Sequence, residues 1–376
     1  MKILVNLSML KRGGGQTVAL NFVDVIPSIN SEDVFYFAVC RNTELDEAVK
    51  RVVKSTQIIY LSHNPYIRIF QERTLLEYYL SKNHIDVVYT YFGYTNIDKR
   101  IPQVSGVADS NLFFPDIDFW EGYSGIVRLY KKMIDSYRVH GYKKADALIF
   151  ENEAMMRQST KILGEKKVTF IRPSVSGLPS KGKEEEKGAE TKQETYIGLL
   201  LCGWQYNKNI LKIPEVVYQV RRLGIDYRFY ITTEKDKSAI CKQFMRDVEK
   251  YNVEEYISLI GNVRKDSLRE LYEKIDHVFL LSKLESFSNN IIEAWCYERP
   301  LLVADEEWSH SICKEGAIFV KRDDAKMIAE TIADILHGDR ASRVVHMGRR
   351  LLLQYPSPLE KACTEIEYVK SVFEEH

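Results

Sequence analysis

The 376-residue sequence contains no apolar run long enough to span a membrane as a helix. Its first residues, Met1–Val5, form a short apolar stretch that lacks the hydrophobic region and cleavage site of a secretory signal. The six cysteines are scattered without any Cys-x-x-Cys spacing, which is typical of reduced, buried thiols. These absences predict a protein that stays in the cytoplasm.

The sequence also lacks an excess of charge of either sign. It contains 53 Lys plus Arg and 53 Asp plus Glu residues, so no overall field attracts nucleic acid, and that class of partner is not expected. Its histidines are isolated, and neither a His-Glu-x-x-His motif nor a nucleophile elbow is present. The sequence therefore contains no motif that supports a hydrolase.

Short apolar runs alternate with helical patterns, as expected of parallel α/β domains. The predicted strands of the first half are Ile3–Leu7, Val34–Val39, Gln57–Leu61, Val87–Thr90, Gln103–Val107, Ala147–Phe150 and Val168–Ile171. Those of the second half are Tyr196–Cys202, Tyr227–Ile231, Ile257–Ile260, Val278–Leu281, Leu301–Ala304 and Ala317–Val320. Between the halves, residues 180–195 contain no apolar residue larger than alanine. We therefore predict domains at 1–174 and 196–355, a charged flexible linker at 175–195 and a helix within 356–376.

Two glutamates, Glu285 and Glu293, lie eight positions apart just after the strand that ends in Leu281. If a helix begins near Ser288 or Asn289, its unpaired N–H groups and positive dipole end can face a diphosphate. One carboxylate can then reach a sugar and the other the hydroxyls of a ribose. The alternative is that both glutamates merely offset the helix dipole, which is common.

The flanking segments favour the first interpretation, because residues 260–282 lead into the pair and the buried strand 301–304 follows it. This half of the sequence resembles that of retaining GT-B glycosyltransferases of the large family four. The resemblance spans nearly the whole chain and is most specific after Tyr196. It implies two Rossmann-like domains that face each other across a cleft, with a C-terminal helix crossing back to the first domain. It also implies no metal and no cofactor beyond a nucleoside diphosphate sugar, the donor substrate.

The resemblance assigns a role to each glutamate: Glu285 lies beside the donor sugar as a catalytic residue, and Glu293 binds the ribose of the nucleotide. The bend between them holds serine and phenylalanine where the family usually has glycine or small residues. The residues predicted to contact the donor there are Ser286, Phe287, Ser288 and Asn289.

Lys208 lies in the turn after the first strand of the second domain, at the start of a predicted helix. A cation at a helix start is electrostatically unfavourable, which argues for an anionic partner over a merely exposed lysine. Its ammonium could stabilise a departing diphosphate without a metal, so we count it as catalytic. Gly203 is also predicted to contact the donor. The family commonly has Gly-Arg in this strand and Lys-Gly or Lys-Asn after the loop, so Lys208-Asn209 matches while Trp204 occupies the position of the arginine. Arg264 is a candidate substitute, and Trp204 has either a donor-stacking or an ordinary packing role.

Three glycines, Gly13–Gly15, follow the first strand and lead into a helix. They do not fit the spacing Gly-x-Gly-x-x-Gly, which argues against a dinucleotide site. Either they form a tight structural turn or, as the resemblance implies, Gly14 and Gly15 belong to a turn that faces the donor.

Aromatic and basic residues interleave across residues 113–144. Such a segment suits peripheral contact with the cytoplasmic face of a membrane, or a lipid-linked acceptor, although a solvated helix with inward aromatics explains it nearly as well. Asp116 and Asp118 form an Asp-x-Asp pair, which we discount as a metal site because it lies far from the donor-side motif.

The overall prediction is a glycosyltransferase that moves a sugar to a glycan or lipid-linked acceptor with retention, in surface polysaccharide biosynthesis by analogy. Two alternatives stay open. A non-hydrolysing sugar-nucleotide epimerase would turn over the donor without any acceptor. A non-catalytic nucleotide-sugar-binding protein would bind the donor and release no nucleotide. The sequence does not identify the base or sugar of the donor.

Overall fold

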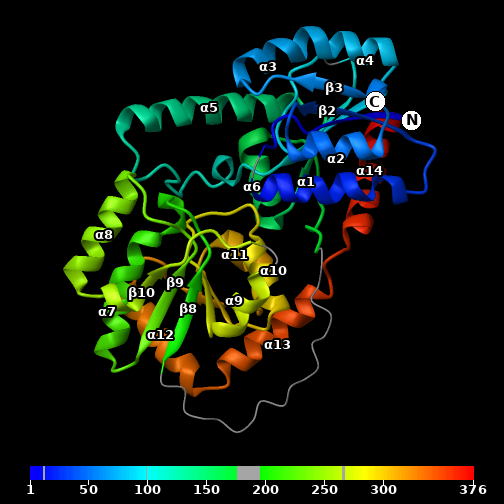
Figure 1. The fold of residues 1–376 in the computed structure, drawn as a ribbon. Helices are drawn as coiled ribbons and strands as arrows, with labels where there is room; N and C mark the ends of the chain where they lie inside the picture. Colours follow the sequence, from blue (N-terminus) through cyan, green and yellow to red (C-terminus); the bar gives the residue numbers. More distant parts are fainter. Residues whose placement is uncertain (12, 99, 176–194, 265–266) are drawn as a thin grey trace. The chain divides into compact units, whose positions relative to one another are not determined.

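The computed structural model describes residues 1–11, 13–98, 100–175, 195–264 and 267–376. The chain divides into two compact units, which are described separately (Figure 1). Unit 1 takes the described residues within 1–115, 125–175 and 355–376, and unit 2 takes those within 116–124 and 195–354. The predicted linker, 175–195, lies outside the described residues except at its two ends.

Unit 1 contains a seven-stranded parallel sheet in the order β3-β2-β1-β4-β5-β6-β7. Its strands are β1 (Lys2–Asn6), β2 (Val34–Cys40), β3 (Ile58–Leu61), β4 (Val87–Thr90), β5 (Gln103–Val107), β6 (Ala147–Phe150) and β7 (Lys167–Phe170). All seven predicted strands are confirmed to within one residue at each end. They are easy to predict because strands covered on both faces are nearly continuous apolar runs.

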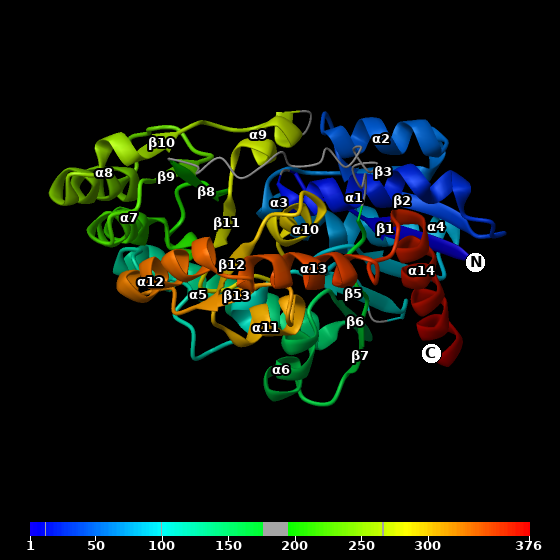
Figure 2. The same ribbon diagram turned by 90° about the horizontal axis from the view of Figure 1, so that it is seen from below.

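The helices of unit 1 are α1 (Gly14–Val25), α2 (Glu44–Val52), α3 (Pro65–Gln71), α4 (Glu77–Asn83), α5 (Gly125–Lys144), α6 (Glu153–Leu163) and α14 (Pro358–Glu375). Residues 67–82 have one continuous helical pattern in the sequence, but in the structure α3 and α4 are joined there by a π-helical turn, Glu72–Leu76. The last helix, α14, buries Ala362, Ile366 and Val369 in the core that also contains β1 and α1 (Figure 2). The predicted return of the C-terminal helix to the first domain is therefore confirmed.

Unit 2 contains a six-stranded parallel sheet in the order β10-β9-β8-β11-β12-β13. Its strands are β8 (Tyr196–Leu200), β9 (Tyr227–Ile231), β10 (Ile257–Leu259), β11 (His277–Leu280), β12 (Leu301–Ala304) and β13 (Ile318–Val320). Its helices are α7 (Ile213–Arg222), α8 (Ala239–Tyr251), α9 (Leu268–Lys274), α10 (Asn289–Cys296), α11 (Glu307–Cys313), α12 (Ala325–His337) and α13 (Arg340–Leu352). The predicted fold class, two Rossmann-like α/β domains, is confirmed.

The position of the candidate site in unit 2 follows from the strand order. The order reverses at β8 and β11, which are neighbours in the sheet although 76 residues of chain separate Leu200 from His277. Loops that leave the carboxyl ends of two such strands diverge to opposite faces, and ligands of open α/β sheets bind between them. The turn with Lys208 follows β8, and the bend with Glu285 follows β11.

Residues 116–124 differ from the sequence-based division, which placed them within the first domain at 1–174. The structure groups them with unit 2. Tyr123 packs edge-on against Tyr206, with ring centroids 5.3 Å apart, and Glu121 forms an ion pair with Lys283. Aromatic packing and charge pairing thus attach this segment to unit 2, a long-range effect that local sequence patterns do not reveal. Within the described part of the chain, no helix combines the length and the apolar character needed to cross a membrane.

Candidate functional site

Asn207 joins the β8 turn to the β11 bend. Its buried side chain donates from Nδ2 to the carbonyl of Leu284 at 2.9 Å and accepts at Oδ1 from the N–H of Leu284 at 3.2 Å. Its own carbonyl accepts from the N–H of Lys283 at 2.8 Å. These bonds hold the two segments in a fixed register, so the residues that follow Asn207 and Leu284 face each other.

Those residues are Lys208 and Glu285. The ammonium Nζ of Lys208 lies 2.5 Å from Oε1 of Glu285, and their side chains are 20% and 14% exposed. Burial lowers the pKa of Lys208, but the charge and hydrogen bond of Glu285 outweigh it, and the net pKa is raised above its ordinary value. Lys208 is therefore a permanent cation at this edge of the sheet. The two residues predicted as catalytic are in direct contact.

Cys202 lies on the same turn and needs a separate assessment, since a thiol near an ammonium can be a nucleophile. Burial raises the pKa of Cys202 to about 12, and the nearby Lys208 charge offsets only part of this effect. A thiol is nucleophilic as its thiolate, so Cys202 is inert at neutral pH. The charged groups seen beside Cys202 are therefore Lys208 and Glu285.

Helix α10 begins at Asn289, as predicted. Its N-cap residue, Ser288, has extended backbone (φ −133°, ψ 124°), and its side chain makes no capping hydrogen bond in the structure. The first turn contains no acidic residue. Asn290 donates from Nδ2 to the carbonyl of Leu201 at 3.1 Å, which fixes this helix start beside the end of β8. A helix start with these properties has the amide groups and the dipole that attract an anion.

Glu293 lies one turn further along α10, where it is half-buried. Oε2 of Glu293 accepts a hydrogen bond from the hydroxyl of Tyr272 on α9, at 3.1 Å. Burial, and then the Glu293 charge, raise the pKa of Tyr272 well above its ordinary value, so this tyrosine remains a donor. Tyr272 also stacks on Tyr297, with centroids 4.5 Å apart. The carboxylate is thus oriented by an aromatic pair that sequence reasoning missed.

The remaining predicted donor contacts of unit 2 lie around this centre. Ser286 and Phe287 are half-buried between Glu285 and the buried Ser288, and Asn289 is exposed at the helix start. Gly203 is exposed, with open space where a side chain would project. Arg264 is exposed in the loop between β10 and α9. Among the described residues, the structure shows no contact between Arg264 and Lys208.

Trp204 has a packing role in the structure. Its indole N–H donates to the carbonyl of Glu234 at 2.7 Å, and its ring meets Phe244 of α8 edge-on at 5.3 Å. Of the two roles considered for Trp204, the ordinary packing role is the one seen here. A donor contact by its outer edge stays a prediction.

The glycine turn lies in unit 1. Gly13 has φ +77°, a left-handed value that favours glycine, and α1 begins at Gly14, where a side chain would meet open space. Gly15 is more restricted, since a Cβ there would lie 3.3 Å from Leu10. The turn leaves the start of α1 uncovered by side chains. Contact of Gly14 and Gly15 with a donor held by unit 2 stays a prediction.

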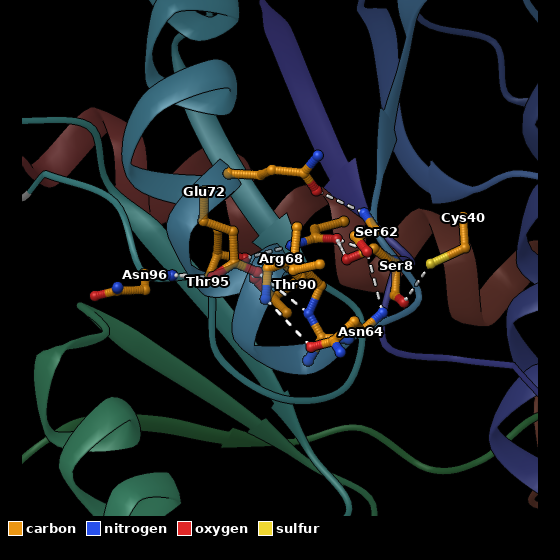
Figure 3. A network of polar contacts seen from close by, with 12 residues as sticks. Ser8, Cys40, Ser62, Asn64, Arg68, Glu72, Thr90, Thr95 and Asn96 are labelled. Atoms are coloured by element: carbon orange, nitrogen blue, oxygen red, sulfur yellow. Dashed lines mark hydrogen bonds and ion pairs between the residues drawn. The ribbon is translucent and has the colours of Figure 1, made fainter.

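A polar network at the carboxyl edge of the unit 1 sheet was not predicted (Figure 3). Asn6 donates from Nδ2 to the hydroxyl of Thr95 at 2.7 Å, and the hydroxyls of Thr90 and Thr95 are 2.5 Å apart. Ser8 donates from Oγ to Oδ1 of Asn6 at 2.7 Å. Each residue follows or ends a strand, but the pairs are up to 89 positions apart in sequence, which is why local patterns could not find them.

A second part of the same network holds α3 (Figure 3). Asn64 caps α3 through Oδ1, which accepts from the N–H of Tyr66 at 2.9 Å. The carboxylate of Glu72, almost fully buried, accepts from the N–H of Asn96 at 3.0 Å and lies 3.7 Å from Nε of Arg68. Burial raises the pKa of Glu72, and these two partners oppose the shift. Glu72 thus joins the turn after α3 to the loop that follows β4, and Oε1 of Gln71, at the end of α3, accepts from the N–H of Ser62 after β3 at 2.7 Å.

The hydroxyl of Ser282, at the end of β11, is buried and has no hydrogen-bond partner among the described residues. It lies two positions before Leu284, which Asn207 holds. Three residues of this edge were thus missed by sequence reasoning: Asn207, Tyr272 and Ser282. Only Asn207 had a local signal, since it sits directly before the predicted Lys208.

The described residues contain no cluster of three or more His, Cys, Asp or Glu side chains that could hold a metal ion. The cation that the structure does place beside Glu285 is Lys208. An anionic ligand at the start of α10 would meet one ammonium, a set of backbone amides and a helix dipole. That arrangement can bind and stabilise a phosphate group.

Comparison with solved structures identifies the fold. A glycosyltransferase from Rickettsia africae ESF-5 superposes with a TM-score of 0.71 at 15% identity, covering 100% of this chain and 99% of that one. A sucrose-phosphate synthase from Thermosynechococcus elongatus gives 0.72 at 14% identity, with 100% of both chains covered. HepE from Anabaena, solved with UDP and glucose, gives 0.70 at 13% identity, covering 99% and 100%. No curated protein sequence matches the chain.

Residues 183–350 match the sequence model of the family described as "Glycosyl transferases group 1". This region contains Lys208, Glu285, Glu293 and the start of α10, so the match covers the residues that the structure brings together. The whole chain has the GT-B fold of the superposed structures. Together these findings show a GT-B fold whose second half is similar to the group 1 glycosyl transferases.

Proposed function

We propose that the protein transfers a sugar from a nucleoside diphosphate sugar to a glycan or lipid-linked acceptor, with retention of the anomeric configuration and without a metal. The observation that carries this proposal is the Lys208–Glu285 pair, 2.5 Å apart beside the uncapped start of α10. The sequence match over 183–350 and the fold support the reaction class. We place the reaction in the cytoplasm, where the six unpaired cysteines would stay reduced.

In this mechanism the diphosphate lies against the amides at the start of α10 and the ammonium of Lys208. The bond between the sugar's anomeric carbon and the diphosphate oxygen breaks, and a bond to the acceptor oxygen forms on the same face. The acceptor's proton passes to the departing phosphate. Lys208 and the helix dipole stabilise the charge that develops on the leaving group, which is where preorganised charges contribute most to a rate.

The two glutamates have different tasks in the proposal. Glu285, held by Lys208, lies beside the transferred sugar and acts during turnover. Glu293, oriented by Tyr272, accepts hydrogen bonds from the ribose hydroxyls and acts in binding. We assign the donor's remaining contacts to Ser286, Phe287, Ser288, Asn289, Gly203, Trp204 and Arg264 in unit 2, and to Gly14 and Gly15 in unit 1.

The first experiment screens nucleoside diphosphates for thermal stabilisation. A ligand at one hundred times its dissociation constant adds roughly 2.7 kcal/mol to the free energy of unfolding. Glu293→Ala should weaken the binding of the stabilising nucleotide, whereas Glu285→Ala should lower turnover more than binding. Glu270→Ala, at an exposed position of α9, is the matched control. Unchanged binding and transfer in both site variants would remove the assignments.

A sugar nucleotide that carries the stabilising nucleoside diphosphate distinguishes the alternative functions. Incubated without an acceptor, an epimerase would convert the sugar nucleotide to its epimer, and a transferase would leave it intact apart from slow hydrolysis. A binding protein would release no nucleotide with any acceptor. Our proposal requires nucleotide release that depends on an added glycan or lipid-linked acceptor. Surface polysaccharide assembly is the process in which we expect that acceptor to occur.

A further inference from the structure

Residues 116–124 belong to unit 2, although the chain on both sides of them belongs to unit 1. We call this segment the strap; it leads into the start of α5 (Figure 1). Its backbone forms turns, one of which is closed by the N–H of Tyr123 donating to the carbonyl of Trp120 at 3.3 Å. A loop without a helix or strand of its own keeps its place through side-chain contacts with its surroundings. Those contacts therefore indicate what the strap does.

The first attachment of the strap is to Tyr206, in the turn after β8. Tyr123 packs edge-on against the ring of Tyr206, with centroids 5.3 Å apart. The backbone of the strap is close to the same ring, since a Cβ at Gly122 would lie 2.5 Å from Cδ1 of Tyr206. Gly122 also has φ +88°, which favours glycine. The strap thus lies directly on Tyr206, which is two residues before Lys208.

The second attachment is the ion pair between Glu121 and Lys283, in the bend after β11. The side chain of Lys283 is only 9% exposed. Burying an ammonium is unfavourable unless it has a partner, so the carboxylate of Glu121 stabilises Lys283 in this orientation. The backbone of Lys283 is held as well, because its carbonyl accepts from the indole N–H of Trp308 at 3.1 Å. Lys283 is two residues before Glu285.

The two attachments bracket the Lys208–Glu285 pair. Each lies two residues before one member of the pair, and the carbonyl of Asn207 accepts from the N–H of Lys283 at 2.8 Å between them. The ammonium and the carboxylate of the pair can stay in contact only while the turn after β8 and the bend after β11 keep their register. The strap contacts both of these segments, so it contributes to that register from outside the pair.

We propose that Glu121 and Tyr123 are positioning residues, which hold the lysine–glutamate pair of unit 2 in the geometry that transfer requires. Glu121 does so through the bend after β11, and Tyr123 through the turn after β8. A displacement of about 1 Å can cost about 100-fold in rate, so a small shift of either segment would slow the reaction. Glu293 is oriented separately, by Tyr272, so nucleotide binding should depend less on the strap. The effect on the rate rests on the proposed function, whereas the hold on the two segments does not.

The first test needs no activity, because it follows the turn after β8 through the thiol of Cys202. Cys202 lies in the apolar cluster against which Tyr206 packs, and burial raises its pKa to about 12, so iodoacetamide should modify it slowly. In the full chain, Glu121→Gln and, separately, Tyr123→Ala should speed this modification at least about tenfold, the effect of lowering the pKa of the thiol by one unit. Mass spectrometry measures the rate. Cys313, buried in α11 of the same unit, is the internal reference and should stay unmodified.

The second test compares turnover with binding, below the melting temperature of each variant. In Glu121→Gln the kcat for transfer should fall about tenfold or more, while the dissociation constant of the stabilising nucleotide changes less than about threefold. Lys283→Gln should lose a similar factor in kcat. The double variant should lose no more than the worse single variant, because both changes remove the same ion pair. Tyr123→Phe keeps the ring on Tyr206 and should transfer at the unaltered rate.

Asp116→Asn is the matched control, because it removes one negative charge from an exposed position of the same strap. It should leave both the kcat and the modification of Cys202 unchanged. Modification of Cys202 as slow in Glu121→Gln and Tyr123→Ala as in the unaltered protein would overturn the proposal, and so would an unaltered kcat in folded Glu121→Gln. If both variants expose Cys202 but the unaltered protein transfers no sugar, the failure lies with the proposed function, and the hold of the strap on the two segments is supported.

Discussion

Two lysine–glutamate pairs of nearly equal length lie at the carboxyl ends of the two sheets, one in each unit. In unit 1, Nζ of Lys361 lies 2.6 Å from Glu151, and in unit 2, Nζ of Lys208 lies 2.5 Å from Glu285. Lys361 has two more partners, Glu365 at 3.2 Å and the hydroxyl of Tyr91 at 3.3 Å. Its side chain is 2% exposed, against 20% for Lys208. The bond length is shared, but the surroundings differ.

The difference separates a structural pair from a ligand-binding one. The ammonium of Lys361 has three N–H donors and three close partners, so it has no capacity left for a ligand. Lys208 is partly open to solvent, lies beside a helix start and can contact a further anion. Burial of a pair with full coordination indicates a role in stability, and a partly exposed pair at a strand end indicates a role in binding.

The largest effect is expected at the buried pair. Lys361→Met would leave Glu151 and Glu365 buried without their cation, which should lower the free energy of unfolding of unit 1 by about 3–5 kcal/mol. The change in the free energy of unfolding of unit 1 is measured by urea unfolding, with hydrogen exchange of the backbone amides in β4 and β6 as the readout. Lys326→Met, at an exposed ion pair of α12, should cost less than about 1 kcal/mol. A loss at Lys361 as small as at Lys326 would contradict the distinction.

At the Lys208–Glu285 pair we expect the opposite result, a large loss of transfer rate with a small loss of stability. Lys208→Ala removes the cation proposed to stabilise the leaving diphosphate, so the transfer rate should fall about 100-fold to 1000-fold. Stability should change by no more than about 1 kcal/mol, because Glu285 is partly exposed to water. Lys212→Ala, at a half-exposed lysine paired with Glu215, is the control for both measurements. If Lys208→Ala lowers the free energy of unfolding by more than about 3 kcal/mol while the protein that remains folded transfers at the unaltered rate, the pair is structural.

A smaller effect is expected at Tyr272, which orients Glu293. Tyr272→Phe removes one hydrogen bond to the carboxylate and keeps the stacked ring, so the affinity for the nucleotide should fall about fivefold, or about 1 kcal/mol. Isothermal titration with the stabilising nucleotide measures this. Tyr297→Phe preserves the stack without touching the Tyr272–Glu293 bond and should leave the affinity unchanged. Equal losses in the two variants would show that the Tyr272–Glu293 hydrogen bond is not what the affinity depends on.

The smallest effect concerns the second carboxylate of the buried cluster. Burial, and then the charge of Glu151, raise the pKa of Glu365, while Lys361 opposes the shift. The folded state therefore binds this proton more tightly than the unfolded chain, and the stability from Glu365 is lost as pH rises through its raised pKa. Glu365→Gln should flatten that decline and change stability at neutral pH by only about 1 kcal/mol. Urea unfolding across a pH series measures the slope, and an unaltered slope would contradict the assignment.

The sequence predicted the strands well and the contacts between loops poorly. Twelve of the thirteen strands match the predicted runs to within one residue, because each is a short apolar stretch bounded by polar turns. The exception is β8, whose pairing with β9 stops at Leu200, while the apolar run continues to Cys202. The π-helical turn Glu72–Leu76 was also missed, since it does not interrupt the helical pattern of its side chains.

For the candidate site, the spacing of Glu285 and Glu293 and the start of α10 could be predicted because they lie within nine consecutive residues, 285–293. The partners of these residues could not. Asn207 contacts Leu284 across 77 positions, and Tyr272 belongs to a different helix from Glu293. Such contacts depend on strand order, which places β8 beside β11. The packing of Trp204 on Phe244 likewise required the position of α8.

The place of α14 in the core of unit 1 has a consequence for synthesis of the chain. Domains usually fold as units while the ribosome is still at work. Unit 1 cannot complete its core in this way, because Ala362, Ile366 and the cation Lys361 are made only after residues 195–354 of unit 2. Residues 195–354 emerge from the ribosome before α14, so the apolar surface that α14 covers must stay exposed or be shielded until residues 358–375 have been made. Premature termination before residue 358 would therefore damage the first-made unit, leaving Glu151 buried without its lysine.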